Sequence, residues 1–143
     1  MIVHIDGGSR GNPGPAGFGV RVAHADGTLV TELSESIGTA TNNVAEYRGL
    51  LAALEWAVAN GQPDLVIHSD SELLVKQMRG EYRVKHPGLQ PLHADARRLV
   101  ARLGHVRFVH VRREHNTHAD ELANQAMDRE AEQKTAVRRQ KTE

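Results

Sequence analysis

The chain has 143 residues, the length of a single domain that can bury a sizeable core. Apolar residues make up 39% and charged residues 25%, as in ordinary globular proteins, and the absence of cysteine excludes disulfides and thiolate metal sites. The opening MIVHIDGG has neither a basic start nor a long apolar run. We therefore expect no signal peptide, no membrane span and a cytoplasmic location.

The charges balance over the whole chain but are unevenly placed. Residues 134–143 carry four basic side chains and one acidic side chain, a charge of +3, so residues 1–133 must sum to −3. A body of that sign attracts phosphates poorly unless bound cations reverse the local field. Net charge therefore neither favours nor excludes nucleic acid as a partner.

The N-terminal third predicts an antiparallel meander. Residues 2–6 are mostly β-branched and end at a glycine pair, which predicts a strand followed by a turn. Residues 8–17, GSRGNPGPAG, are so rich in glycine and proline that we expect a loop. Residues 18–24 and 28–37 predict two strands joined by a hairpin at Asp26-Gly27.

From Val44 onward, the pattern changes to helices that alternate with short buried strands. Apolar residues recur at the spacing of one helical face until Asn60-Gly61, where the first helix is expected to end. The elements expected after it are a strand at 65–68, helices at 71–79 and 91–103, a strand at 106–111 and a helix at 117–130.

This order of elements predicts an α/β fold with a five-stranded mixed sheet, three antiparallel strands followed by two parallel ones. Parallel strands need right-handed crossovers, which place helices on both faces of the sheet. We expect one domain over residues 1–130. Residues 131–143 form a basic tail without apolar periodicity, which we expect to be mobile.

Four acidic residues lie where elements begin or end. Asp6 ends the first predicted strand, Asp70 follows the fourth, and Glu46 and Asp120 lie in the first turns of two helices. If the first and fourth strands are neighbours, Asp6 and Asp70 meet at one end of the sheet, where ligand sites of α/β folds lie. Clustered carboxylates repel each other unless cations lie among them, and hard oxygen ligands favour Mg²⁺ or Mn²⁺.

Each of these residues alone also has a structural interpretation. Asp120 can interact with the helix dipole behind an N-cap at Thr117, and Asp70 can cap the helix that follows it. Asp6 can hold the turn at the glycine pair, and Glu46 can be a salt-bridge partner. Only the four together favour a metal centre.

Four segments occur in the order of a known family: DGGSRGNPGP at 6–15, TNNVAEY at 41–47, SDS at 69–71 and NTHADELA at 116–123. Over residues 1 to about 128 the chain resembles the ribonuclease H type I family. The resemblance implies the ribonuclease H-like fold and an endoribonuclease that cuts the RNA strand of RNA–DNA hybrids, leaving 5′-phosphate and 3′-hydroxyl ends. It also implies two Mg²⁺ ions, replaceable by Mn²⁺, held by the four carboxylates: Asp6, Glu46, Asp70 and Asp120.

The resemblance further implies substrate contacts from the glycine-rich segment. Gly7, Gly8 and Gly11 would let the backbone approach nucleic acid closely. Ser9 and the backbone around Gly11 would contact 2′-hydroxyl groups, which distinguish RNA from DNA. The alternative interpretation is a hairpin connection that needs glycine and proline merely to turn.

A second group of implied contacts lies around the start of the first helix. Thr41 and Asn12 match a pocket that grips a phosphate of the DNA strand, which would position the duplex. Asn42 and Asn43 would reach base edges in the minor groove.

Nine histidines invite a further search for catalytic or metal-binding groups. By resemblance, His115 is the candidate for an auxiliary residue that assists proton transfer or product release, with Glu114 and Arg113 as alternatives. A zinc site at His115 and His118 lacks further ligands in the sequence. We expect His4, His68 and His110 to be structural residues of the sheet.

Two departures from the family put tight or processive binding in doubt. Residues 81–93 offer only Arg83 and Lys85 where some relatives carry a basic helix and loop, and no hybrid-binding module is expected before Asp6. The basic tail either compensates or is merely solvated. The alternatives to a hybrid nuclease are a non-catalytic nucleic-acid-binding module and a DNA-processing nuclease or integrase of the same fold. We expect a monomer.

Overall fold

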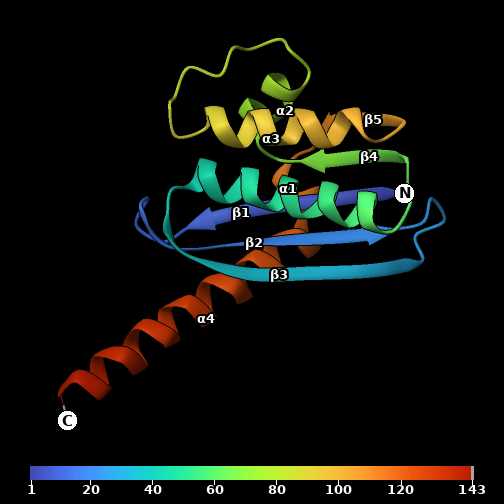
Figure 1. Ribbon diagram of the computed structural model, residues 1–143. Coiled ribbons are helices and arrows are strands. Elements are labelled where there is room, and N and C mark those ends of the chain that lie inside the picture. Colours follow the sequence, from blue (N-terminus) through green and yellow to red (C-terminus); the bar gives the residue numbers. More distant parts are fainter. Residues whose placement is uncertain (143) are drawn as a thin grey trace.

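The computed structural model describes the backbone of residues 1–142 and the side chains of residues 1–133 (Figure 1). Its five strands form one mixed sheet in the order β3-β2-β1-β4-β5. β1 (Ile2–Ser9), β2 (Gly14–Ala23) and β3 (Leu29–Ala40) pair antiparallel, whereas β4 (Asp64–Ser69) lies parallel to β1 and β5 (His105–His110) lies parallel to β4. The predicted α/β fold and its division into antiparallel and parallel strands are confirmed.

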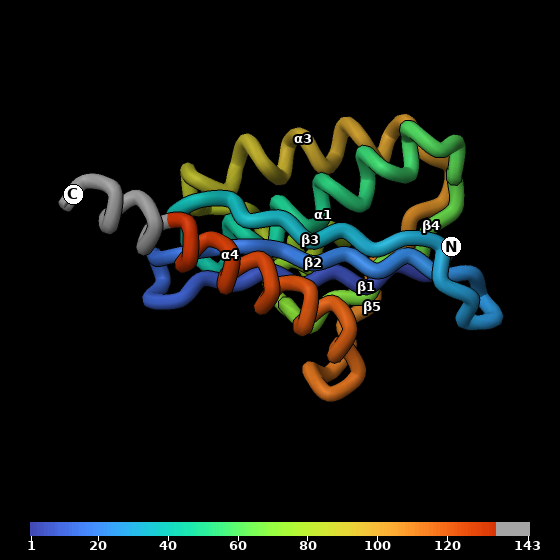
Figure 2. Tube along the Cα trace, turned by 90° about the horizontal axis from the view of Figure 1, so that it is seen from below, coloured from blue at the N-terminus to red at the C-terminus, as the bar shows by residue number. Residues whose placement is uncertain are grey.

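Helices cover both faces of the sheet. α1 (Asn42–Ala59) and α3 (Gln90–Ala101) lie on one side of the strands, and α4 (Thr117–Thr142) crosses the other side (Figure 2). The short α2 (Glu72–Met78) connects β4 to the segment before α3, and a 3₁₀ turn at Arg113–His115 precedes α4. Among the described residues, no helix combines the length and the apolar character needed to cross a bilayer.

The main core lies between the sheet and α1. Strand side chains alternate between the two faces, so Val3 and Ile5 of β1 point into this core together with Ile67 of β4. Tyr47 and Leu50 of α1 are fully buried against them. Because Asp6 and Glu46 each adjoin a buried residue, the core fixes the elements that carry the carboxylates.

The glycine-rich segment is more ordered than the sequence predicted. β1 continues through Gly7 to Ser9 and β2 already begins at Gly14, so the predicted loop at 8–17 shrinks to residues 10–13 and Asp6 lies inside a strand. The reason is packing. A Cβ on Gly17 would lie 2.4 Å from the Ala126 Cβ of α4, so glycine here allows close helix–sheet contact.

The last helix is longer than predicted. We expected it to end near Glu130, but α4 continues to Thr142. A helix that extends past the edge of the sheet, as α4 does in Figure 1, needs no apolar stripe, so apolar periodicity underestimates its length. The side chains of residues 134–143 lie outside the described residues, and mobility of the tail stays a prediction.

Candidate active site

All four predicted carboxylates line one cleft of about 750 Å³. One carboxylate oxygen each from Asp6, Glu46 and Asp70 lies within 4.8 Å of the other two. Asp6 and Asp70 therefore meet at one end of the sheet, as expected for neighbouring first and fourth strands. Asp120 lies beside them on α4, close enough to exchange a hydrogen bond with Asp6.

Local backbone contacts bring the carboxylates together. β1 and β4 are parallel with Ile5 opposite Ser69, so Asp6 and Asp70 follow at equivalent positions on neighbouring strands. A Cβ on Gly7 would lie 2.4 Å from the Glu46 backbone nitrogen, so only glycine lets the first turns of α1 approach β1 this closely.

The start of α4 is attached to β1 by a buried amide. The Asn116 side chain, 1% exposed, donates a 2.9 Å hydrogen bond from Nδ2 to the Ile5 carbonyl oxygen. The Asn116 carbonyl accepts the backbone N–H of Asp120 at 3.0 Å. Asn116 thus connects the backbone of β1 next to Asp6 with the backbone of α4 at Asp120.

Burial and mutual repulsion raise the pKa values of Asp6, Glu46 and Asp70. Burial, followed by the charge of Asp70 and the interaction with Asp120, raises the pKa of Asp6 to about 8. Burial also raises the pKa of Glu46 to about 7, opposed by a hydrogen bond from Ser71. The pKa of Asp70 is raised chiefly by burial, and the Arg113 guanidinium opposes that shift. The Arg113 guanidinium thus offsets only part of the cost of gathering these carboxyl groups.

The donor set fits a hard divalent cation. On an octahedral Mg²⁺ at 2.0–2.1 Å, neighbouring oxygens lie about 2.9 Å apart and opposite oxygens about 4.2 Å apart, so the carboxylates would rotate inward to share one ion. Asp120 carries two further contacts: Arg113 Nη2 lies 3.8 Å from its Oδ1, and Asn124 donates from Nδ2 to its Oδ2 at 3.3 Å. Sequence reasoning missed Asn124, although its position four residues after Asp120 places both on one helix face.

The residues expected to contact substrate fall into two groups. Gly7, Gly8, Ser9 and Asn42 line the cleft. Its walls do not include the other four expected residues, which are Gly11, Asn12, Thr41 and Asn43.

Hydrogen bonds nevertheless join these residues into one unit. Asn42 Oδ1 accepts the Ser9 backbone N–H at 2.7 Å, and the Asn42 N–H donates to Asn12 Oδ1 at 3.0 Å. Thr41 caps α1 through its hydroxyl, which accepts from Val44. The loop at residues 10–13 is thereby fixed to the start of α1.

Residues 4–126 match the protein family described as Reverse transcriptase-like. The crystallised N-terminal RNase H domain of Rv2228c from Mycobacterium tuberculosis shares 48% identity, with a TM-score of 0.88 over 93% of this chain and 98% of that one. The chain belongs to the ribonuclease H type I family. The RNase H1 of Halobacterium salinarum is also similar, at 42% identity and a TM-score of 0.85 over 89% of this chain and 96% of that one.

A third ribonuclease H relative, LC11-RNase H1, was solved in complex with an RNA/DNA hybrid and shares 43% identity, with a TM-score of 0.85 over 90% of this chain and 96% of that one. Among curated relatives, the bifunctional protein Rv2228c of M. tuberculosis is 47% identical over 95% of this chain. The chain spans only 38% of that protein's length and 63% of the length of the H. salinarum Ribonuclease HI.

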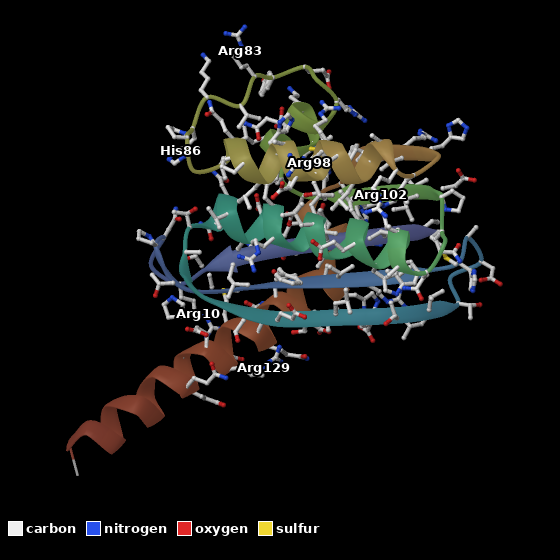
Figure 3. The ribbon with its side chains drawn as sticks, viewed as in Figure 1. Arg10, Arg83, His86, Arg98, Arg102 and Arg129 are labelled. Carbon is white, nitrogen blue, oxygen red and sulfur yellow. The ribbon has the colours of Figure 1, made fainter. Side chains whose placement is uncertain are left out.

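For a ribonuclease H, the segment before α4 is where an auxiliary residue was expected. His115 is not among the residues that line the cleft, whereas Arg113, Glu114 and His110 are. His110 Nε2 lies 3.3 Å from the Asp70 carbonyl oxygen. Arg83, one of the two basic residues of the segment at 81–93, points outward between α2 and α3 (Figure 3).

Proposed function

We propose that this chain is an endoribonuclease that hydrolyses the RNA strand of RNA–DNA hybrids. The observation that carries the proposal is the convergence of Asp6, Glu46 and Asp70, with oxygens within 4.8 Å of one another, in an open cleft that Asp120 also lines. A purely structural role does not explain why so many carboxyl groups are gathered where burial raises their pKa.

The four carboxylates would hold two Mg²⁺ ions, with Mn²⁺ as a possible substitute. When bound, such ions activate an attacking water and stabilise charge on the departing 3′ oxygen, which yields 5′-phosphate and 3′-hydroxyl ends. The four ionised carboxylates would balance two dications and leave the site able to accept a phosphate. Arg113, beside Asp120, adds a positive charge at the rim of the cleft.

Substrate recognition is assigned to the unit that joins the loop at residues 10–13 to α1. Ser9 and the backbone around Gly11 would contact 2′-hydroxyls, Thr41 and Asn12 a phosphate of the DNA strand, and Asn42 and Asn43 base edges. The hydrogen bonds between Ser9, Asn42 and Asn12 support this proposal because they hold the contacting groups before substrate arrives.

Three finer proposals follow. Among the auxiliary candidates, Arg113 and Glu114 line the cleft, and His115 would have to turn toward it. One copy of the chain supplies all four carboxylates, so a monomer would suffice. A cytoplasmic setting agrees with the cysteine-free composition.

Matched duplexes test the proposal. RNA–DNA, RNA–RNA and DNA–DNA duplexes of one sequence are incubated with the chain in Mg²⁺ or in chelator, beside Asp70→Asn and, as a control, Glu55→Gln at an exposed position of α1. We expect cleavage of the RNA strand of the hybrid alone, abolished by chelator and by Asp70→Asn only. Equal cleavage of DNA–DNA would indicate a DNA-processing nuclease, and binding without cleavage a non-catalytic module.

A further inference from the structure

A second pocket lies at the edge of the sheet, away from the carboxylates. It has a volume of about 280 Å³ and lies between α2, α3 and the edge strand β5. None of its lining residues lines the carboxylate cleft. Among the described residues, its walls combine four apolar side chains with three arginines, which are Arg79, Arg97 and Arg107. We call this cavity the arginine pocket.

Two of the arginines are held in place by backbone carbonyls. Arg79 donates from Nε to the Phe108 carbonyl oxygen on β5 at 2.9 Å. Arg97 donates from Nη2 to the Gln77 carbonyl oxygen in the last turn of α2 at 3.2 Å. These bonds satisfy an edge strand and a helix end, which is a structural role. They also fix both guanidinium groups beside the pocket while most of their N–H groups stay available to a ligand.

The third arginine has no such structural role. Arg107 is exposed on β5, and within residues 1–133 its side chain makes no hydrogen bond or ion pair. The pocket has only weak compensation from Glu81, whose Oε2 lies 3.7 Å from Arg79 Nη1 with both side chains about half exposed. Guanidinium groups stay charged at any pH of interest. The three positive charges therefore repel each other unless an anion lies among them.

The floor of the arginine pocket is apolar. Met78 is 2% exposed and Phe108 is 7% exposed, and Val100 and Val106 are half-buried beside them. A ligand that fills the pocket therefore needs an apolar or aromatic part next to its anionic group. Small-molecule sites measure about 300–1,000 Å³, so this pocket fits a small molecule or one end of a chain and not a duplex.

We propose that the arginine pocket binds the phosphate of a nucleoside monophosphate, either free or at the phosphorylated end of a nucleic-acid strand. A phosphomonoester carries about −1.5 to −2 charges at pH 7 and three acceptor oxygens. It matches three guanidinium groups better than a carboxylate does, which has a single charge and room for one guanidinium fork. The sugar or base would lie on the apolar floor. A phosphodiester within a duplex has one charge and keeps its bases paired away from such a floor.

The ligand class connects the pocket with the proposed reaction without depending on it. Under the proposed function, the products carry 5′-phosphate ends and belong to this class. A product end could then occupy the arginine pocket while the carboxylate cleft stays free, because the two share no lining residue.

The test measures binding directly, without a hybrid. AMP, adenosine and inorganic phosphate are each titrated into the full chain in chelator, where the metal-free carboxylates repel phosphate, and binding is followed by NMR. We expect AMP to shift the resonances of Val100, Val106 and Phe108. Adenosine and inorganic phosphate should each bind at least about tenfold more weakly, because each lacks one half of the ligand. A trinucleotide with a 5′-phosphate, compared with its 5′-hydroxyl form, distinguishes a strand end from a free nucleotide.

Arg107→Ala should weaken AMP binding at least about tenfold, and it breaks no internal hydrogen bond. Arg102→Ala, at the exposed end of α3 and outside the pocket, is the matched control that should leave the affinity unchanged (Figure 3). An unchanged urea midpoint shows that each variant is folded.

Three results would overturn the site: equal AMP binding by folded Arg107→Ala and the parent, equal binding of adenosine and AMP, or shifts confined to the carboxylate cleft. Inorganic phosphate that binds as tightly as AMP would overturn the nucleoside part of the ligand. A short acidic peptide that binds more tightly than AMP would indicate a protein partner and overturn the assignment to a nucleotide. Hybrid cleavage is measured separately, so failure of the proposed function and failure of this site are distinguishable.

Discussion

Replacing Asp6 by Asn should stabilise the metal-free protein above neutral pH. Asp6 is 8% exposed, and its pKa of about 8 lies far above the ordinary value of 3.8. Asn keeps the shape and can still accept the 2.9 Å hydrogen bond from the Gly7 N–H through Oδ1. It removes only the charge that the folded state disfavours.

The sign follows from proton binding. Between the unfolded and folded pKa values, the folded state holds a proton on Asp6 that the unfolded state has lost, so stability falls as pH rises through this window. His4, whose pKa is lowered to about 4, has the opposite effect below about pH 6.5. Between about pH 6.5 and 8, the pH dependence of the free energy of unfolding therefore reports on the carboxylates.

Over that range Asp6 should account for a loss of ~1.5 kcal/mol in the free energy of unfolding. The full slope is about 1.4 kcal/mol per pH unit, reduced near pH 8 because the folded carboxyl is half ionised there. Glu46, with a pKa of about 7, adds a smaller loss that persists in the variant.

Urea unfolding in chelator at several pH values measures these slopes, with Glu55→Gln on the exposed side of α1 as the control. We expect Asp6→Asn to show a shallower decline than the parent and to be the more stable protein at pH 8. Added Mg²⁺ should reverse the order, because an ion bound only by the folded parent stabilises it. If the variant is less stable than the parent at pH 8 in chelator, Asp6 is a structural residue and the reasoning is wrong.

Three further predictions concern packing, anchoring and the tail. Gly19→Ala places a methyl group 2.4 Å from the Ala119 carbonyl oxygen. Urea unfolding should therefore show a loss of roughly 2 kcal/mol in the free energy of unfolding. An unchanged unfolding midpoint would contradict the close packing of α4. Asn116→Asp removes the buried donor to the Ile5 carbonyl oxygen. We expect a loss of ~1–3 kcal/mol in the free energy of unfolding, together with slower hybrid cleavage. Normal cleavage would show that this hydrogen bond does not position Asp120. Deleting residues 134–143 removes a net charge of +3 and should reduce the log–log salt dependence of hybrid binding by up to roughly 2.7 units, whereas an unchanged slope would exclude the tail from binding.

The carboxylate centre was predictable because its residues lie at recognisable ends of elements. The fourth strand pairs in parallel with the first, which brings Asp6 and Asp70 together at the same end of the sheet. Glu46 and Asp120 lie in the first turns of helices, whose positions follow from apolar periodicity and capping residues. Their convergence required no knowledge of side-chain packing.

The strands in the glycine-rich segment were not predictable in the same way. Glycine occurs both in turns and where another element packs closely against a strand. A sequence shows that Gly7 and Gly17 lack side chains, but not whether a turn or a close neighbour requires this. Here α1 lies against Gly7 and α4 against Gly17, so tertiary contacts extend strands through a segment with strong turn signals. Asn124 was missed for a similar reason, since a polar helix residue is informative only once its neighbours are known.

The residues that hold the site in place are distinct from those that carry its charge. Once both are ionised, Asp6 and Asp120 repel each other, so their own side chains cannot hold the site together. Instead the buried amide of Asn116 connects Ile5 with the start of α4, and the missing side chain of Gly7 lets α1 approach β1. The backbone can therefore keep the carboxyl groups together while no cation is bound. Under the proposed function, bound cations would restore the stability lost in this arrangement, so the cluster would be arranged in advance for its ligand.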